Sequence, residues 1–450
     1  MIKKVLIANR GEIAARVIRA CKKLGIQTVA VYSEADQHAP YIEMAEESAL
    51  LGPPRVNDSY LNVEKLISLA KKHGVDAIHP GYGFLSENAT FAKRCEAEGF
   101  IFIGPSSEVI EKMGSKIAAR KIMSQANIPI IPGVNEAITS PEEAVQYAKD
   151  LGYPVMLKAS AGGGGIGMEV VHSDEELRKS FENNQKRAQT FFGDGAMFME
   201  KKIEHAHHVE IQILADKHGQ VIHLYDRECS IQRRNQKVIE EGPSPFISEK
   251  TRQAMGDAAV TAAKALSYTN AGTIEFLVDQ EENFYFLEMN TRIQVEHPVT
   301  EEITGIDIVA EQLRIASGQE LSVKQENIGV TGHAIEARIY AEDPVTFFPS
   351  PGQILRLELP EAAYIRHEIA ITKGMNVTPF YDPMVAKLIV KGKDRQEALN
   401  RLRFALENYH IEGIKTNIPM LLKVVNHKQF QVGQTTTAFV DEHYIPLIKN

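Results

Sequence analysis

The sequence predicts a multidomain protein that combines an α/β domain with α+β regions. Three observations lead to this prediction. Short apolar runs alternate with helical periods in the first third of the chain, strands with hairpin turns begin near residue 208, and strands mix with helices after about Gly332. A chain of 450 residues, of which 44% are hydrophobic and 24% are charged, is long enough for two or three such domains.

The first third predicts a parallel sheet. The segments VLIAN and IQTVAVYS have the pattern of strands, and GEIAARVIRACKKLG between them has the pattern of a helix that Gly25 closes. Two further apolar runs, VDAIHPGYG and FIFIGPSS, end in turns, and such a β-α-β series is typical of a parallel sheet covered by helices. The turn after the first strand contains Gly11 alone, so we do not expect the three-glycine turn of an NAD site.

Composition narrows the class of partner. A formal net charge of -9 argues against broad binding to nucleic acid or to an acidic membrane surface, because counterion release favours a basic surface. No apolar run approaches the ~20 residues of a membrane span, and the N-terminus is charged again after a short apolar run. Three widely separated cysteines, Cys21, Cys95 and Cys229, have no metal-ligand spacing and predict reduced thiols. We therefore expect a cytoplasmic protein that binds neither nucleic acid nor membrane.

A second region opens near PSSEVIEKMGSKIAARKIM, and it contains the glycine-rich stretch KASAGGGGIGMEVV. Residues 162–167 satisfy G-x-G-x-x-G, but MEVV continues as a strand, and the next helix begins only at SDEEL, where Ser173 and Glu176 can form a capping box. This order excludes a Rossmann turn, and the GK[ST], HRD and DFG strings of P-loops and kinases do not occur. We expect a loop between two strands whose amides, with Lys158, bind phosphates; a mobile hairpin without a ligand is the alternative.

Two acids predict a metal site. If TIEFLVD and FYFLEMN are strands joined by QEEN, counting back from the turn pairs Leu277 with Phe286. Two residues further on, Glu275 then lies directly opposite Glu288, and like charges so paired are destabilising unless one pKa rises or a cation binds. Asn290 lies on the same face, and such oxygen ligands suit Mg²⁺ bound with nucleotide phosphates. A solvated pair of acids at a sheet edge is the alternative.

The polar alternation continues beyond these acids. Asn290, Arg292, Gln294 and Glu296 follow at period two, so an extended chain places them on one face. Arg292 offers a planar fork to a carboxylate-like anion, and Glu296 offers a base beside it, which suggests acyl-phosphate chemistry. The alternative is a solvent-facing strand.

The segment CSIQRRNQKVIEE adds three basic residues, Arg233, Arg234 and Lys237. They form either a basic wall of the same cleft or a charged strand.

Six separated motifs occur in order, namely ANRGEIA, HPGYGFLSEN, GGGGIGM, CSIQRRNQK, EMNTRIQVEHPVTE and EARIYAEDP. Together they resemble the biotin carboxylase family of the ATP-grasp superfamily, over residues 1 to about 445. The likeness is greatest to the free-standing subunits of bacterial acetyl-CoA carboxylase. It implies an N-terminal doubly wound α/β domain (1–114), a central ATP-grasp domain (115–330) with a mobile lid at about 133–202, and a mixed α+β C-terminal domain (331–450).

The resemblance also implies an ATP site and a metal site. Mg²⁺ or Mn²⁺, as two ions, would lie on Glu275, Glu288 and Asn290. ATP would be bound by Lys116, Lys158, Gly164, Gly165, Glu200, Lys201, Lys202, Ile203, His208, Gln232, Asn235, Glu275, Leu277 and Glu288. Two residues depart from the family, because Ile166 stands where a basic residue is usual and Asn235 where a histidine is common.

The implied reaction is the ATP- and bicarbonate-dependent carboxylation of biotin N1. Bicarbonate would be bound by Lys237, Arg292, Gln294, Val295 and Glu296. Glu296 would be the base, and attack on ATP would give carboxyphosphate, which yields CO₂ and phosphate. The phosphate would take the N1 proton of biotin and Arg338 would stabilise the enolate, with Tyr82 and Gly83 on the biotin side.

The resemblance further implies partners. The chain has no MKM-type biotin-attachment motif, so biotin would arrive on a carrier protein and pass to carboxyltransferase subunits, in the first half-reaction of malonyl-CoA formation for fatty acid synthesis. A homodimer is implied as well. The alternatives are the biotin carboxylase of another acyl-CoA or pyruvate carboxylase complex, an ATP-grasp ligase that joins a carboxylate to an amine, and a non-catalytic nucleotide-binding regulator.

Overall fold

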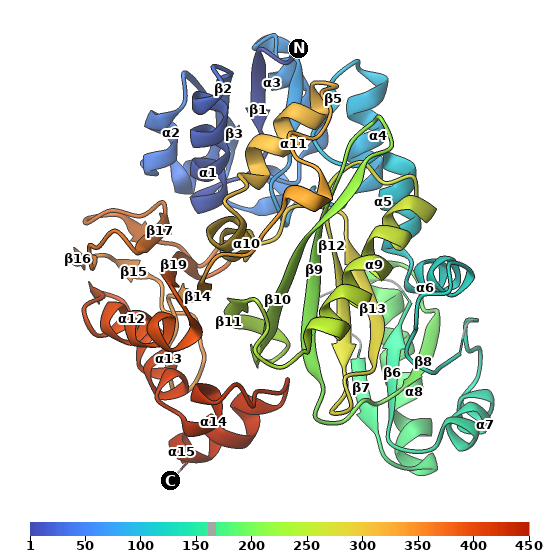
Figure 1. Ribbon diagram of the computed structural model, residues 1–450. Helices are drawn as coiled ribbons and strands as arrows, with labels where there is room; N and C mark the ends of the chain where they lie inside the picture. Colours follow the sequence, from blue (N-terminus) through green and yellow to red (C-terminus); the bar gives the residue numbers. More distant parts are fainter. Residues whose placement is uncertain (135, 161–167, 450) are drawn as a thin grey trace.

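The computed structural model describes residues 1–134, 136–160 and 168–449. Its N-terminal part is a five-stranded parallel sheet in the order β3-β2-β1-β4-β5, with helices against it (Figure 1). The strands are β1 (Lys4–Ile7), β2 (Gln27–Ser33), β3 (Glu47–Gly52), β4 (Ala77–His79) and β5 (Ile101–Phe102). The parallel sheet predicted from the sequence is confirmed.

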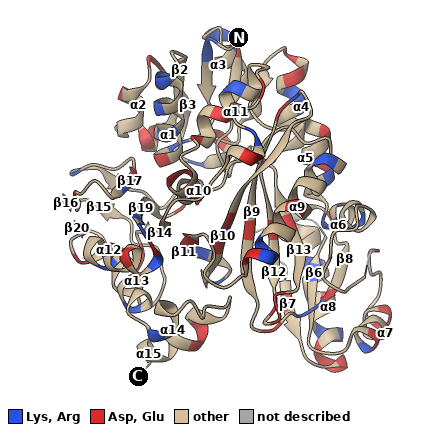
Figure 2. Ribbon diagram, in the orientation of Figure 1, with Lys and Arg blue, Asp and Glu red and all other residues tan. Residues whose placement is uncertain are grey.

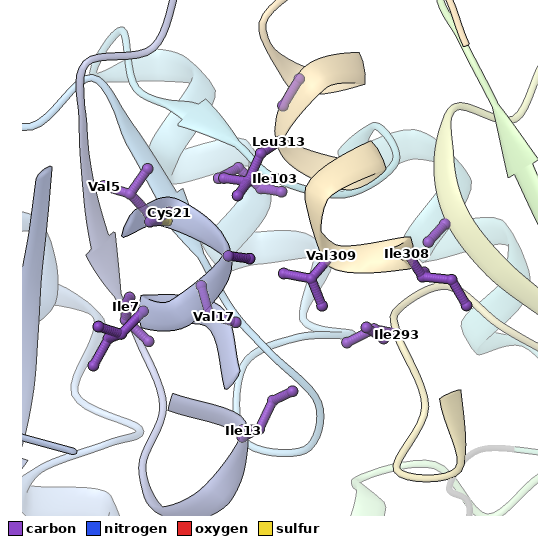
Figure 3. Close-up of a cluster of buried hydrophobic side chains, with 14 of the residues drawn as sticks. Val5, Ile7, Ile13, Val17, Cys21, Ile103, Ile293, Ile308, Val309 and Leu313 are labelled. Carbon is purple, nitrogen blue, oxygen red and sulfur yellow. The ribbon is translucent and has the colours of Figure 1, made fainter. Parts of the chain in front are cut away.

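Helix α1 (Gly11–Lys23) connects this sheet to the rest of the molecule. Ile13, Val17 and Cys21 recur every four residues, so they share one buried face of the helix. That face packs toward α11 (Ile308–Ala316), as Figure 3 shows for Val309 and Leu313. The helix ends before Gly25, whose φ of +69° is the left-handed conformation that favours glycine.

An eight-stranded sheet crosses the centre of the molecule in the order β13-β12-β9-β10-β11-β14-β19-β17. Its central strands are β9 (His207–Ala215), β10 (Val221–Arg233), β11 (Gln236–Gly242), β12 (Asn270–Val278) and β13 (Phe284–Asn290), all antiparallel as the alternating pattern predicts. Strands β14 (His333–Tyr340), β19 (Met384–Gly392) and β17 (Ile365–Ile369) extend it into the C-terminal region. One sheet therefore spans both sides of residue 330.

A small lobe projects from this sheet (Figure 1, lower right). Strands β6 (Val155–Ala159), β7 (Met168–Val171) and β8 (Met197–Lys201) form its sheet, and α7 (Pro141–Leu151) and α8 (Asp174–Phe192) enclose a separate apolar core. Strand β7 returns after the glycine-rich segment, and Ser173 accepts a hydrogen bond from the Glu176 amide at the start of α8, both as predicted. The expectations for Gly164, Gly165 and Ile166 lie outside the described residues.

The C-terminal region packs helices against β14 and β19. Helices α12 (Arg395–Glu407) and α13 (Ile418–Val425) share a core with these strands, and α10 (His297–Thr304) contacts β10, β11, β14 and β19. The remaining helices are α2 (Pro40–Met44), α3 (Val63–Lys72), α4 (Ala89–Ala97), α5 (Ser107–Gly114), α6 (Lys116–Gln125), α9 (Glu249–Ala265), α14 (Lys428–Gln431) and α15 (Ile445–Lys449). Short strands β15 (Gly352–Gln353), β16 (Arg356–Glu358), β18 (Asn376–Val377) and β20 (His410–Glu412) pair near the surface.

Two sequence expectations concern the whole chain. Cys21, Cys95 and Cys229 are free and buried, as predicted. Among the described residues, the helices are either too short or too polar to span a lipid bilayer.

Candidate active site

A cavity of about 660 Å³ lies where the central sheet, the small lobe and β14 meet. It brings together most of the residues singled out in the sequence. Those that line it are Lys116, Lys158, Glu200, Lys202, Ile203, His208, Gln232, Asn235, Lys237, Glu275, Leu277, Glu288, Asn290, Arg292, Gln294, Val295, Glu296 and Arg338. Figure 2 shows acidic and basic segments next to each other on β10 and β11, in the middle of the molecule.

The predicted pair of acids is confirmed, but part of the predicted register is wrong. Glu275 on β12 lies opposite Glu288 on β13, whereas Leu277 pairs with Tyr285 and not with Phe286. A register shift between Glu275 and Phe276 adds one residue to β13 and restores the pair. The two carboxylates and the Asn290 carbonyl thus lie on adjoining strands at the cavity wall.

Glu275 is the more buried of the two acids, at 3% exposure. Burial alone would raise its pKa, but the charges of Lys237 and His208 outweigh burial and hold the pKa of Glu275 well below its usual value. Asn290 and Gln294 also donate to its Oε1, at 2.8 and 2.6 Å. Glu275 is therefore an ionised oxygen donor at neutral pH.

Glu288 is more accessible, and its Oε2 lies 3.4 Å from Lys116 Nζ at the start of α6. Two carboxylates and an amide oxygen are hard ligands of the kind that bind Mg²⁺. Glu275 also belongs to a second cluster with His208 and Glu210, whose ligand atoms lie within 4.8 Å of one another. Glu210 is fully buried, is already bound by Arg227 and Lys237 and does not line the cavity, whereas Glu288 does, so the set with Glu288 fits a divalent cation better.

Lys237 is the central cation of the cavity. Its Nζ donates to Glu210, Glu275 and Glu296, at 2.6, 2.8 and 2.7 Å. Burial would lower the pKa of Lys237, but the three carboxylates raise it well above its usual value. The ammonium therefore stays protonated and connects the metal-binding acids to Glu296.

A tight hairpin places Lys237 at this point. Arg234 and Asn235 form the two-residue connection between β10 and β11, with φ of +50° and +63°. Two successive positive φ values suit the right-handed twist of a hairpin, and asparagine tolerates this conformation better than most residues. Asn235 thus fits the backbone of this turn.

Glu296 is 2% exposed and immediately precedes α10. Its Oε1 accepts from Lys237 at 2.7 Å and its Oε2 from Arg338 at 3.0 Å. Burial would raise the pKa of Glu296, but Lys237, Arg338 and Arg227 together lower it far below its usual value. An ionised, buried carboxylate held by two cations can accept a proton from an acid bound beside it.

The predicted extended stripe from Asn290 to Glu296 is wrong beyond its first member. Strand β13 ends at Asn290, and the chain turns before α10 begins at His297. Arg292 accordingly reaches back, donating to Asn290 Oδ1 at 2.7 Å, while its Nε donates to Glu87 at 2.9 Å. Gln294 and Glu296 still face the cavity because the turn, not a strand, directs them there.

Most residues expected to bind the nucleotide line the cavity, but Lys201 does not. Lys158 and Glu200 form a buried ion pair on adjoining strands of the small lobe, and burial followed by the charge of Lys158 lowers the pKa of Lys202. Gln232 Nε2 donates to His208 Nδ1 at 2.8 Å. Lys201 differs, because its Nζ donates to the carbonyl oxygens of Gly152 and Tyr153 and is directed away from the cavity.

The two residues expected on the biotin side do not line the cavity wall. The Tyr82 hydroxyl donates to Glu12, and Gly83 is exposed with φ of +66°. Glu12 in turn lies 3.1 Å from Lys387, whose Nζ donates to the Val295 carbonyl at 2.7 Å. Tyr82 is thus connected to the cavity through buried polar contacts.

Sequence reasoning missed Glu87, Glu210 and Arg227. Arg227 is 0% exposed and donates to Glu210 at 2.6 Å and to Gln294 at 2.6 Å, so it supports the floor of the cavity. Glu210 could have been found, because polar residues His208, Glu210 and Gln212 alternate in an otherwise apolar strand. Glu87 lies in the N-terminal region, and its contact with Arg292 has no local sequence signal.

Three family models cover nearly the whole chain. They are described as the N-terminal domain of biotin carboxylase (residues 1–110), the ATP-binding domain of the carbamoyl-phosphate synthase L chain (residues 115–324) and the C-terminal domain of biotin carboxylase (residues 336–442). Similar proteins agree with these matches. A biotin carboxylase of Halalkalibacterium halodurans is 63% identical over 98% of both chains, and biotin carboxylase 2 of Bacillus subtilis is 60% identical over 98% of this chain and 100% of that protein.

Solved structures give the same result. The biotin carboxylase domain dimer of Hydrogenobacter thermophilus 2-oxoglutarate carboxylase, in complex with MgADP, ADP and bicarbonate, matches with a TM-score of 0.97 at 50% identity. The match covers 100% of this chain and 99% of that one.

Proposed function

This chain belongs to the biotin carboxylase family of ATP-grasp ligases, and from that premise we propose that it carboxylates N1 of biotin with ATP and bicarbonate. One observation carries the proposal. Lys237 contacts both Glu275, a candidate metal ligand, and Glu296, a candidate base, so nucleotide and bicarbonate chemistry meet at one ammonium group.

The residues divide the work as follows. Glu275, Glu288 and Asn290 would hold Mg²⁺ or Mn²⁺, as two ions, and the metal would supply positive charge to neutralise and orient the ATP phosphates. Lys116, Lys158 and His208 line the nucleotide side of the cavity, together with Glu200, Lys202, Ile203, Gln232, Asn235 and Leu277. The amides of Gly164 and Gly165 and the backbone near Lys201 belong to the same proposed nucleotide site.

Bicarbonate binds between Lys237 and Arg292, beside Gln294 and the Val295 amide. Glu296 takes its proton, and the resulting dianion attacks the γ-phosphorus of ATP, giving carboxyphosphate and ADP. Carboxyphosphate breaks down to CO₂ and phosphate, and that phosphate removes the N1 proton of biotin. Arg338 then stabilises the biotin enolate while N1 of biotin attacks CO₂. Tyr82 and Gly83 are proposed to contact biotin.

We propose that the small lobe at about 133–202 closes over ATP. We also propose that the domain boundaries lie after residues 114 and 330. Biotin is supplied in trans on a carrier protein and passes to carboxyltransferase subunits, and the protein acts as a homodimer. Among carboxylase complexes we favour acetyl-CoA carboxylase in the cytoplasm, and thus fatty acid synthesis, because the relatives at 63% and 60% identity are named as biotin carboxylases alone. The match to a 2-oxoglutarate carboxylase domain keeps another acyl or oxoacid carboxylase as the second candidate.

ADP release tests this function. With ATP and Mg²⁺ present, bicarbonate and free biotin are omitted in turn. A biotin carboxylase needs both for its full rate, whereas a ligase that joins a carboxylate to an amine needs neither. An unchanged rate of ADP release when bicarbonate or biotin is omitted would reject the proposal.

A further inference from the structure

Two buried acids that the proposed reaction does not use lie directly behind the cavity. Glu240 on β11 and Glu336 on β14 are cross-strand partners, and both are 0% exposed. Cross-strand pairs share one face of a sheet, and two negative charges in that position destabilise the fold. Burial away from water makes two ionised carboxylates here still less favourable.

The contacts of the two acids differ. Oε1 of Glu240 accepts from Arg338 Nε at 2.6 Å, and the same guanidinium donates to Glu296 Oε2 at 3.0 Å. Within the described part of the chain, Oε2 of Glu240 and both oxygens of Glu336 are buried without a hydrogen-bond partner. A proton on Glu336 would supply the donor that the free oxygen of Glu240 lacks.

Among the described residues, no cation forms a hydrogen bond or ion pair with Glu336. The charged groups that act on it are Glu240 on β11, Arg338 on its own strand, Lys387 on β19 and Glu296 just before α10. His297 lies on α10, which packs against β14. Lys387 is engaged by Glu12 and by the Val295 carbonyl. Burial lowers the pKa of His297 far below its usual value, so this imidazole is neutral.

The titration of the pair agrees with this geometry. Burial raises the pKa of Glu336 well above its usual value; the charge of Lys387 opposes this shift, and the charge of Glu240 adds to it. Burial also raises the pKa of Glu240, to about 7, although Arg338 opposes it. Since Arg338 contacts Glu240 and not Glu336, the first proton belongs on Glu336.

We propose that Glu336 is a neutral carboxylic acid that donates a hydrogen bond to Oε2 of Glu240, and that Glu240 thereby holds Arg338 in place against Glu296. Both acids are positioning residues that act through Arg338. The hydrogen bond from Glu336 draws negative charge from Glu240. The carboxylates of Glu240 and Glu296 therefore do not fully neutralise the positive charge of Arg338, which can still bind an anion. The positioning role rests on the proposed function, whereas the protonation of Glu336 does not.

Thermal unfolding of Glu336→Gln tests the protonation without any assay of activity. If the pKa of Glu336 is higher in the folded protein than in the unfolded chain, the parent loses stability as pH rises above the pKa of the unfolded chain. The amide of the variant Glu336→Gln does not titrate, so the variant lacks this loss. The melting temperature of Glu336→Gln minus that of the parent should therefore grow between about pH 5 and pH 9. Glu361→Gln, at an exposed position, is the matched control and should show no trend. A difference for Glu336→Gln that stays constant over this range would overturn the neutral state of Glu336.

Kinetics of the purified enzyme with ATP, bicarbonate and free biotin test the positioning role. Glu240→Gln should lower kcat by about 10-fold or more with little change in the KM for ATP, as expected for losing a charged partner of Arg338. Glu336→Gln should move the alkaline limb of kcat to higher pH than in the parent. A parallel loss of kcat, ATP binding and melting temperature in Glu240→Gln would assign that residue a purely structural role. If the parent itself fails to carboxylate biotin, the proposed function is wrong and the unfolding comparison still decides the state of Glu336.

Discussion

Lys237 Nζ lies 2.7 Å from Glu296 Oε1 and 2.8 Å from Glu275 Oε1. The ammonium compensates a base on one side and a candidate metal ligand on the other. Both carboxylates stay ionised for that reason, although burial opposes it. A base that is charged at neutral pH and lies beside a nucleotide site is what bicarbonate activation requires.

Replacing a candidate metal ligand should change the response to Mg²⁺. Glu288→Gln keeps the shape of the side chain but removes a charge that the cation needs, so turnover should fall by orders of magnitude at limiting Mg²⁺. The measurement is the rate of ADP release over a Mg²⁺ titration, with Glu281→Gln on the exposed hairpin loop as control. Parent-like activity of Glu288→Gln at low Mg²⁺ would remove Glu288 from the metal site.

The small lobe should respond to nucleotide. Its three-stranded sheet and two helices have their own core, and a bridge between Ile130 and Phe286 joins the segment that leads into the lobe to the central sheet. Closure over ATP should protect the lobe, so limited proteolysis within residues 133–202 should slow when ATP and Mg²⁺ are added. Cleavage at other sites in the chain serves as the internal control. Equal cleavage of the lobe with and without nucleotide would count against closure.

Acid pH should weaken the ion pairs of Glu241, which does not line the cavity. Burial would raise the pKa of Glu241, but His333 and Arg395 lower it to about 2, so its stabilising contribution is complete above about pH 4.5 and is lost as pH falls toward 2. Glu241→Gln should therefore cost about 3 kcal/mol of unfolding free energy at pH 7 and clearly less at pH 3.5. Urea unfolding at both pH values measures the difference. A cost that is the same at pH 3.5 would show that Glu241 is not ionised by these partners.

Local patterns were enough to predict the sheets and the acid pair, whereas contacts between distant segments were not predictable. The turn QEEN and the alternation on either side of it placed Glu275 opposite Glu288, yet the extra residue of β13, Leu287, has no signal in the sequence. The period-two pattern through Arg292 and Glu296 suggested a strand where the chain turns, because alternation alone does not reveal where a strand ends. Glu240 and Glu336 are far apart in the sequence and meet only in the folded sheet.

The central claim is that Glu296 is the base that activates bicarbonate, and Glu296→Ala tests it most directly. The variant loses no proposed phosphate contact, so ATP binding measured by calorimetry should match that of the parent and of the exposed control Glu320→Ala. Bicarbonate-dependent ADP release should fall by roughly 10²-fold or more, the usual contribution of a positioned base. Normal ATP binding together with ADP release within a few-fold of the parent would contradict the account and assign the base to another residue.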